Sequence, residues 1–478
     1  MDVLDVQALL PILILALLPV VVMLAVAVVR SHRLVFGLTV AGMTLALGAT
    51  AASLALIPRQ VTALLVIDGY ALFFLGLVLA ASLVVTLLSY RYWQACDCNP
   101  EEYYILLSLA TLGAAVLVCS NHFASFFLGL EILSVSLYAM IAYTYDLRFR
   151  VEAGLKYLIL AAASSAILLF GMALLYAGLG TLSFAELAAN AGDAAAPGIV
   201  LLGAGMVVAG VGFKLALVPF HLWTPDVYQG APLPVTAFIA TVSKGGMFAL
   251  VLRLFTEFGI GDYAVMVNGF AALAILSMLL GNLMALLQNN LKRVLAYSSI
   301  AHMGYLLVPF VALNASGQQA IAFYLVAYIA SSLLAFGVMT VMSSWQNEWE
   351  SIEDYRGLFW RRPWLAVGMA AALFSLAGLP PTVGLTGKFF LAAAGVEAAV
   401  WLPLLALIAG SAIGVFYYAR VAISLFFGRE DEAPATAGLP LSTGSTAVLG
   451  LLAVLVILLG VYPMPVFRVI AAMIEGLV

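Results

Sequence analysis

The sequence predicts an all-α polytopic membrane protein with about fourteen transmembrane helices, arranged as two inverted five-helix repeats with discontinuous helices 7 and 12. Of its 478 residues, 65% are hydrophobic and only 9% are charged, whereas a soluble domain is about half apolar and about one quarter charged. Apolar runs of about 20 residues, the length with which a helix crosses a bilayer, recur along the whole chain. The lysines and arginines gather in alternate connections between these runs.

The apolar runs, taken in order, give fourteen candidate spans. They are 8–29, 34–57, 70–90, 103–120, 123–144, 156–179, 198–218, 233–256, 263–287, 294–313, 320–342, 364–396, 400–427 and 446–470. The first run is too long for a cleaved signal peptide and follows no basic region, so we expect it to be the first span. The 364–396 run is too long for one straight span, and its middle reads GLPPTVGLTGK.

The basic residues predict the orientation of these spans. If the first connection faces the cytoplasm, the cytoplasmic connections hold Arg30, Arg33, Arg91, Arg148, Arg150, Lys156, Lys292, Arg293, Arg356, Arg361, Arg362 and Arg429. The opposite connections hold only Arg59 and Arg468. Cytoplasmic loops of membrane proteins carry an excess of lysine and arginine, so we predict that both termini are periplasmic.

Two predicted helix breaks indicate internal repeats. Pro219 removes a backbone donor from the seventh span, and the sequence GLPP at 378–381 interrupts the twelfth. Broken helices in corresponding positions of two halves are typical of inverted repeats in transporters, and 103–256 and 263–427 supply five spans each. We therefore predict three N-terminal helices in 1–98, a first repeat in 99–258, an inverted second repeat in 259–430, and a connection with the last helix in 431–478.

Four ionisable residues stand inside predicted spans, namely Glu131, Lys214, Lys244 and Lys388. Each such placement costs about 2.5–3.5 kcal/mol or more near the bilayer centre, which favours a functional role. Burial disfavours the charged form of a lysine and a nearby carboxylate favours it, so a lysine under both influences can lose and regain a proton. The pattern predicts a proton relay. The alternative, that Glu131 and Lys214 pair only to fasten two helices, leaves Lys244 and Lys388 without partners.

Two histidines are further candidates for the relay. His221 follows Lys214 by seven residues, so two helical turns would place it about 10 Å away on the same face. That position suits a water-bridged step toward Lys244, although a histidine capping the broken helix explains the pattern equally well. His302, in the polar stretch YSSIAHMGY, is placed to couple the two halves. Arg253 lies toward a helix end, where we expect its side chain to reach the membrane surface.

Several signatures of other protein classes are absent from the sequence. No G-x-G-x-x-G opens a βαβ unit, and no Walker A motif, haem site or iron–sulfur spacing is present. Cys96 and Cys98 form a lone C-x-C without a second Cys/His cluster, so we predict no metal site. The net charge of −4 does not suggest a nucleic-acid partner. We expect no cofactor in this chain, so any redox chemistry that drives it must occur on partner subunits.

Four stretches of the chain resemble one known family. They are LVPFHLWTPDVYQGAPLPVTAFIATVSKGGMF, LGLEILSVSLYAMIAY, LKRVLAYSSIAHMGYL and FSLAGLPPTVGLTGKFF. They are similar to the subunit N family of bacterial respiratory complex I, the proton-pumping NADH:quinone oxidoreductase, and the resemblance covers essentially the whole chain. It implies that Glu131 modulates the proton affinity of Lys214, that Lys244 connects the two halves, and that Lys388 faces the outward exit. The related subunit M carries a glutamate at the position of Lys388, and subunit L continues into a long lateral helix.

The resemblance also implies the setting in which the chain works. It implies the bacterial inner membrane, with the antiporter-like subunit M and the small subunits K, J and A as partners. NADH, FMN, iron–sulfur clusters and quinone are then expected on partner subunits. Two alternatives share the ancestry, namely a subunit of a multisubunit cation/proton antiporter and a subunit of a membrane-bound hydrogenase. A third possibility, a structural spacer, predicts that Lys214→Ala leaves proton pumping unchanged.

Overall fold

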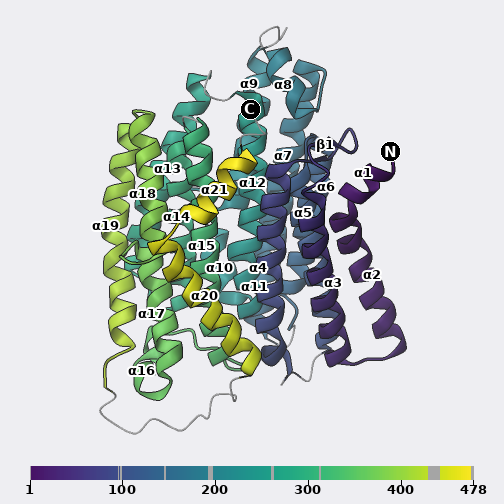
Figure 1. Ribbon diagram of the computed structural model, residues 1–478. Coiled ribbons are helices and arrows are strands. Elements are labelled where there is room, and N and C mark those ends of the chain that lie inside the picture. Colours follow the sequence, from purple (N-terminus) through teal and green to yellow (C-terminus); the bar gives the residue numbers. More distant parts are fainter. Residues whose placement is uncertain are drawn as a thin grey trace.

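The structure is a computed structural model that describes residues 2–94, 96, 99–144, 147–191, 197–259, 263–311, 314–428 and 442–474. Cys98 lies outside these residues. Within them the chain is nearly all helical, and its one small sheet pairs β1 (Arg59–Gln60) with β2 (Val66–Ile67) in antiparallel register. Figure 1 shows the helices standing side by side in one bundle, with α1 (Val3–Ala8) at the end opposite α16 (Leu358–Arg361).

Twelve helices among the described residues are long and apolar enough to cross a membrane. They are α2 (Leu10–Val28), α3 (His32–Ser53), α4 (Gly69–Gln94), α5 (Pro100–Cys119), α6 (Phe123–Ile141), α7 (Arg148–Leu179), α9 (Pro197–Leu215), the continuous segment Leu233–Phe258, α13 (Ala264–Leu286), α15 (Ala315–Met342), α19 (Trp401–Ser424) and α20 (Thr443–Val461). The other two predicted spans are α14 (Leu291–Phe310), which is less apolar, and the pair α17 (Pro363–Ala377) and α18 (Val383–Glu397). The predicted set of about fourteen spans is confirmed. The division into four domains stays a prediction.

Both predicted discontinuities are present. The seventh span ends as α9 at Leu215, Ala216 has a positive φ of 61°, and the chain resumes as α10 (Trp223–Gly230). The twelfth ends as α17 at Ala377, Gly378 has a φ of 82°, and α18 follows. At the first break, the backbone N–H of Val218 is not part of a helix and donates instead to the hydroxyl of Ser277 at 2.9 Å. This is how irregular backbone is tolerated at membrane depth.

Two irregularities were not predicted. The eighth span, Leu233–Phe258, consists of α11 (Leu233–Phe238), a π-helical turn η1 (Ile239–Ser243) and α12 (Lys244–Phe258). The last predicted span, 446–470, is divided into α20 and the shorter α21 (Met464–Ile474). Pro463 lies between these two helices and cannot donate the backbone hydrogen bond that would continue the first one. Figure 1 shows α20 crossing the bundle obliquely before the chain turns into α21.

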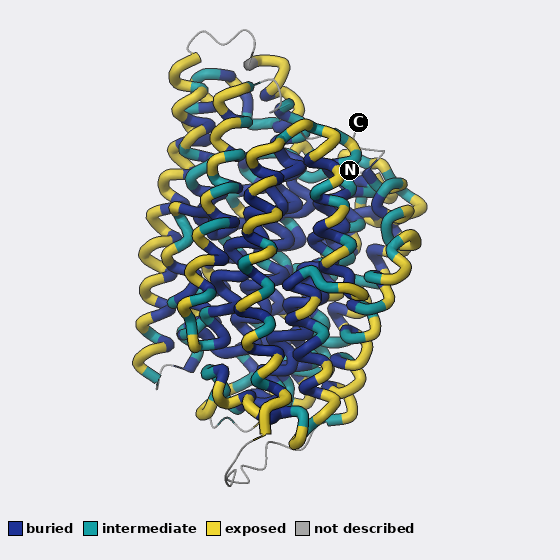
Figure 2. The backbone as a smooth tube through the Cα atoms, turned by 90° about the vertical axis from the view of Figure 1, so that its left-hand side faces the viewer, coloured by how far each residue is buried: buried dark blue, intermediate teal, exposed yellow. Residues whose placement is uncertain are grey.

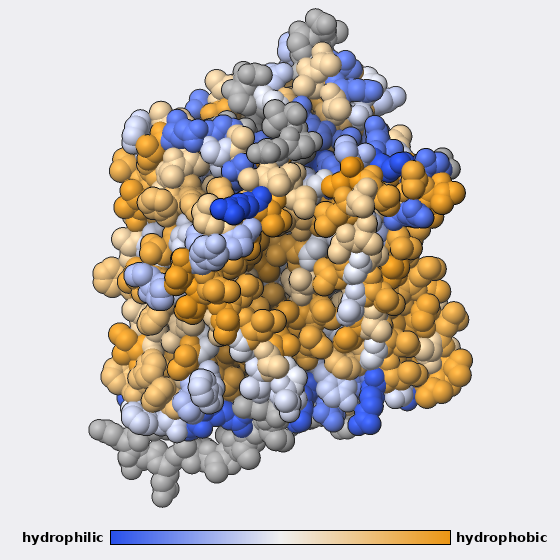
Figure 3. All heavy atoms as spheres, in the orientation of Figure 1, coloured by the Kyte–Doolittle hydropathy of each residue, from blue (hydrophilic) through white to orange (hydrophobic). Residues whose placement is uncertain are grey.

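The remaining short helices are α8 (Phe184–Ala191) and a 3₁₀ turn, η3 (Ile352–Tyr355). The core of the bundle is formed by α11–η1–α12, α14 and α15, whose residues are almost all buried. Figure 2 shows this buried centre inside a layer of helices with exposed outer faces. Figure 3 shows that apolar side chains cover the middle of the bundle while polar residues collect toward its two ends, as expected for a protein surrounded by lipid.

Candidate functional site

The three predicted lysines are buried, and each lies beside irregular backbone. Lys214, Lys244 and Lys388 are 8%, 1% and 7% exposed. Lys214 is the penultimate residue of α9, Lys244 directly follows η1, and Lys388 is in the second turn of α18. Breaks and π turns free backbone groups inside the protein and are frequent at functional sites.

Glu131 and Lys214 are held by serines. The Oε1 of Glu131, half-buried on α6, accepts a hydrogen bond from Ser165 of α7 at 2.7 Å. The ammonium of Lys214 donates to Ser134 of α6 at 2.7 Å and lies 5.5 Å from the ring centroid of Tyr157. Glu131 and Ser134 are three residues apart on one helix, so both groups lie on neighbouring positions of the same face. The fastening alternative required a direct pair, whereas in the described chain each group binds a serine.

Lys244 begins an ordered chain of hydrogen bonds. Its ammonium donates to the hydroxyl of Ser299, on α14, at 2.6 Å. The hydroxyl of Ser299 lies 2.7 Å from that of Tyr328 on α15, which donates to the carbonyl of Ala240 at 3.0 Å. Because the tyrosine proton is used on this carbonyl, Ser299 must donate to Tyr328. Ala240 belongs to η1, so the π turn supplies the acceptor that orients the chain.

His302 is bound by tyrosine hydroxyls on both ring nitrogens. Nδ1 lies 2.7 Å from the hydroxyl of Tyr324, on α15, and Nε2 lies 3.1 Å from that of Tyr418, on α19. A neutral imidazole donates from one nitrogen and accepts at the other, and a hydroxyl can do either, so both tautomers fit. The ring centroid of His302 lies 5.3 Å from that of Tyr328, which is linked through Ser299 to Lys244. It also lies 5.4 Å from that of Tyr305, which packs against the ammonium of Lys388.

Lys388 binds the carbonyls that the twelfth-span break leaves free. Its ammonium donates to the carbonyl oxygens of Leu376 and Ala377 at 3.1 and 2.9 Å, at the C-terminal end of α17. A cation is favourable there because the helix dipole is negative at that end. The same ammonium lies 5.0 Å from the ring centroid of Tyr305, whose ring centroid is 5.4 Å from that of His302.

Two expectations from the sequence were wrong. The helix that carries Lys214 ends at Leu215, so His221 does not lie two turns further along the same face; it is half-buried in the connection between α9 and α10. Arg253 does not reach the membrane surface. Its side chain is 1% exposed and forms a bidentate ion pair with Asp68, with both contacts at 2.8 Å. The carboxylate neutralises the guanidinium, so Arg253 can stay buried.

Sequence reasoning also missed a buried charge cluster. Arg150 and Lys292 were assigned to cytoplasmic connections, but their side chains are 1% and 0% exposed. Both pair with Glu348, whose side chain is 4% exposed, at 3.4 and 2.6 Å. Glu348 also accepts from the hydroxyl of Tyr92 and from the N–H of Leu233. Glu348 is one of four acids in a long polar connection, and nothing in the sequence marks it as the buried one.

No group of three or more His, Cys, Asp and Glu side chains that could hold a metal ion occurs among the described residues.

Residues 120–414 match the family model described as the transmembrane region of NADH:quinone oxidoreductase and Mrp antiporters. The chain is thus an antiporter-like membrane subunit. It is 46% identical over 464 residues to the NADH-quinone oxidoreductase subunit N of Methylococcus capsulatus, covering 96% of this chain and 93% of that protein. It is also 46% identical over 473 residues to the protein of that name from Ectopseudomonas mendocina, covering 97% and 95%. The chain belongs to the NADH-quinone oxidoreductase subunit N family, which confirms the resemblance.

Solved structures of several membrane complexes contain chains with this fold. A chain of respiratory complex I from Thermus thermophilus with bound aureothin is 33% identical, with a TM-score of 0.84, covering 97% of this chain and 100% of that one. A chain of an archaeal membrane-bound sulfane sulfur reductase is 25% identical, with a TM-score of 0.86 and coverage of 100% and 98%. A chain of the Mrp complex from Dietzia sp. DQ12-45-1b has a TM-score of 0.87 and the same coverage, but at 20% identity it shares the fold alone.

Proposed function

We propose that this chain translocates protons within an NADH:quinone oxidoreductase through Glu131, Lys214, Lys244 and Lys388, while partner subunits carry out the electron transfer. One observation carries the proposal. Each lysine is buried and hydrogen-bonded to neutral groups, namely a serine hydroxyl at Lys214 and Lys244 and two carbonyls at Lys388. Such a lysine can release its proton without breaking an ion pair, which a buried partnered cation cannot do.

The contacts give the relay an order. Glu131 lies three residues before Ser134 on α6, and Ser134 accepts a hydrogen bond from Lys214 of α9. Lys244 is joined through Ser299 to Tyr328, whose ring centroid lies 5.3 Å from that of His302. A proton released by Lys244 therefore has hydroxyl and imidazole groups in reach on the way toward Lys388. Charging one buried lysine disfavours a charge on its neighbour, so protonation of successive sites is coupled.

The setting follows from the family and from the charge distribution. We place the flavin, the iron–sulfur clusters and the quinone site on partner subunits, since no motif for them occurs in this sequence. The antiporter-like subunit M and the small subunits K, J and A are the proposed neighbours. Twelve basic residues in one set of connections against two in the other support insertion in the bacterial inner membrane with both termini periplasmic.

Replacing Lys214 tests the proposal directly. We expect Lys214→Ala to leave the complex assembled and to abolish most NADH-driven proton pumping together with most NADH:quinone turnover, because the first relay lysine is lost. The measurements are dye quenching and NADH oxidation in inside-out membrane vesicles, with complex content followed on native gels. Arg356→Ala is the matched control, because this arginine is exposed in the connection after α15 and its ion pair is with Glu353, three residues away. Unchanged pumping and turnover in assembled Lys214→Ala would support the structural-spacer alternative instead.

A further inference from the structure

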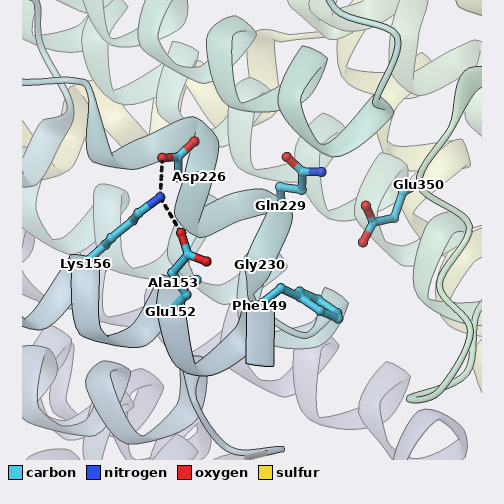
Figure 4. A pocket seen from close by; sticks show the side chains of 8 residues that line it. All are labelled: Phe149, Glu152, Ala153, Lys156, Asp226, Gln229, Gly230 and Glu350. Carbon is cyan, nitrogen blue, oxygen red and sulfur yellow. Dashed lines mark hydrogen bonds and ion pairs between the residues drawn. The ribbon is translucent and has the colours of Figure 1, made fainter. Parts of the chain in front are cut away.

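A cavity opens beside the broken seventh span, at the end of the bundle that carries most of the basic residues. It has a volume of about 440 Å³, which is room for several water molecules at about 30 Å³ each. Its lining comes from the start of α7, from α10 and from the connection after α15, and consists of Phe149, Glu152, Ala153, Lys156, Asp226, Gln229, Gly230 and Glu350. Figure 4 shows that Lys156, Glu152 and Asp226 form one wall while Glu350 stands apart on the other.

The charges on the two walls have different partners. Lys156 bridges Glu152 at 2.8 Å and Asp226 at 3.2 Å, and Arg293 holds the other oxygen of Asp226 at 2.9 Å. These pairs neutralise that wall. Glu350 is the lining carboxylate that faces inward, because its Oε1 lies 3.7 Å from the ammonium of fully buried Lys292.

Glu350 is fixed in place by the start of α14. Its Oε2 accepts from the side-chain amide of Asn290 at 2.8 Å, and its carbonyl accepts from the N–H of Leu291 at 2.6 Å. Its side chain is 26% exposed, so one carboxylate meets both the cavity and the buried cluster. Among the described residues that line this cavity, Glu350 is the one that forms an ion pair with Lys292.

Lys292 lies between the cavity and Ser299, the residue that binds Lys244. It lies seven residues before Ser299 on α14, which is two turns and about 10 Å along the same helix face. Ser299 is the residue that accepts from Lys244 at 2.6 Å, and it also lies 3.4 Å from the hydroxyl of Tyr228, on α10. Three or four hydrogen bonds of ordinary length cover the distance from Lys292 to Ser299.

We propose that this cavity is the mouth through which protons enter from the cytoplasmic side, and that Glu350 is the group that loads them. The proposal rests on the proposed function and names the uptake end of the same relay. Hydronium in the cavity gives its proton to the Glu350 carboxylate and leaves water. The Glu350 carboxyl then releases its proton inward, toward Ser299 and Lys244, and becomes a carboxylate again, while Lys292 keeps its charge beside Glu348 and holds Glu350 in place. The net result is one proton moved from the cavity to Lys244.

The test is Glu350→Gln in the complete complex, because an amide keeps the shape and can still accept from Asn290 but cannot carry the proton. A carboxylate in a narrow cleft raises the local supply of protons, and steering of this kind is worth about ten- to a thousandfold in rate. We expect proton pumping and turnover to fall about tenfold at mildly alkaline pH, where free protons are scarce, and about twofold at mildly acidic pH. Glu350→Asp should restore most of the rate.

Other ionisable groups around Glu350 also contribute to the pH dependence of the rate. They are Lys292, Glu348 and Tyr355 on the inner side, and Glu152, Lys156 and Asp226 across the cavity. Glu353→Gln is the matched control, since its side chain lies in the same connection as Glu350, is 75% exposed and is not part of the cavity lining. It should leave both the rate and its pH profile unchanged. A normal rate and profile in Glu350→Gln, or an equal effect of Glu353→Gln, would overturn the proposal.

Two further experiments test the cavity and the relay separately. Gln229→Cys places a thiol on the cavity wall, and a bulky cationic thiol reagent applied to the cytoplasmic face should then block pumping, whereas the unsubstituted protein is unaffected. Continued pumping after complete labelling would overturn the proposal even if Glu350→Gln fails to assemble. Lys244→Ala separates the two hypotheses. If it is inactive while Glu350→Gln is normal, only the uptake route is wrong; if it pumps normally, the proposed function itself is wrong.

Discussion

Two groups of buried cations lie in this molecule, and they differ in what they bind. Lys292 and Arg150 share the carboxylate of Glu348. Lys244 and Lys388, which are buried just as deeply, donate to a hydroxyl and to two carbonyls. Burial alone therefore does not distinguish a relay lysine from a structural one. The chemistry of the partner does.

The partner decides whether a proton can leave. A proton lost from Lys292 would leave Glu348 to be shared with Arg150 alone, so the ammonium is stabilised where it is. A buried ammonium without a carboxylate has no such compensation, and releasing its proton removes the desolvation penalty. The first arrangement fixes a charge and the second lets it move.

The ion pairs lie toward opposite ends of the bundle. Glu348 joins α7 of the first predicted repeat to α14 of the second at the end with most basic residues. At the other end, Asp68 at the start of α4 binds Arg253 near the end of α12. Between them lie the lysines bound to neutral groups. Rigid ion pairs thus position the helices, while the sites between them can exchange protons.

The largest effect should come from removing the shared carboxylate. Glu348→Gln leaves two buried cations with only the partly exposed Glu350 nearby, and breaking a buried pair costs about 3–5 kcal/mol. We expect the subunit to be lost from the assembled complex, measured as complex content on native gels and as the thermal unfolding midpoint in detergent. Glu353→Gln, whose side chain is 75% exposed in the same connection, should have no effect and serves as the control. A normally stable Glu348→Gln would contradict the assignment of this cluster as structural.

A pair of identical substitutions sharpens the comparison. Lys388→Met replaces an ammonium that has no carboxylate, so the free energy of unfolding should stay the same or rise, while proton pumping is lost. Lys292→Met removes half of a neutralised cluster and should lower stability by about 1–3 kcal/mol. Stability is measured by thermal unfolding of the purified complexes and pumping by dye quenching in vesicles. Equal destabilisation by both substitutions would show that the partner does not set the difference.

The residues of the proposed relay could be singled out from the sequence because charged residues are unusual in membrane spans. Glu131, Lys214, Lys244 and Lys388 stand out since charges are expensive in apolar helices. Proline and glycine residues predicted both broken helices, because these residues change the backbone conformation at their own positions. These features are visible one residue at a time, without knowledge of what packs beside them.

The unpredicted features depend on contacts between distant segments. The π turn at 239–243 contains the unremarkable sequence IATVS, and its role appears only when Tyr328 binds the Ala240 carbonyl. Glu348 lies in a polar connection like any surface acid, and only the folded chain brings Lys292 and Arg150 to it. The position of His221 failed for a related reason. The helix stopped earlier than its proline suggested, because Ala216 already leaves helical geometry.

The smallest effect should come from moving the one relay carboxylate. Glu131→Asp keeps a negative charge near Lys214 but, being one methylene shorter, gives up the 2.7 Å contact with Ser165. Charge acts over several ångströms in a medium of low dielectric whereas a hydrogen bond does not, so we expect turnover to fall only about threefold. Ser165→Ala removes the same contact from the other side and should match that loss. Glu131→Ala removes the charge and should abolish most pumping. Full activity of assembled Glu131→Ala would mean that Lys214 works without a carboxylate, as Lys244 and Lys388 already do.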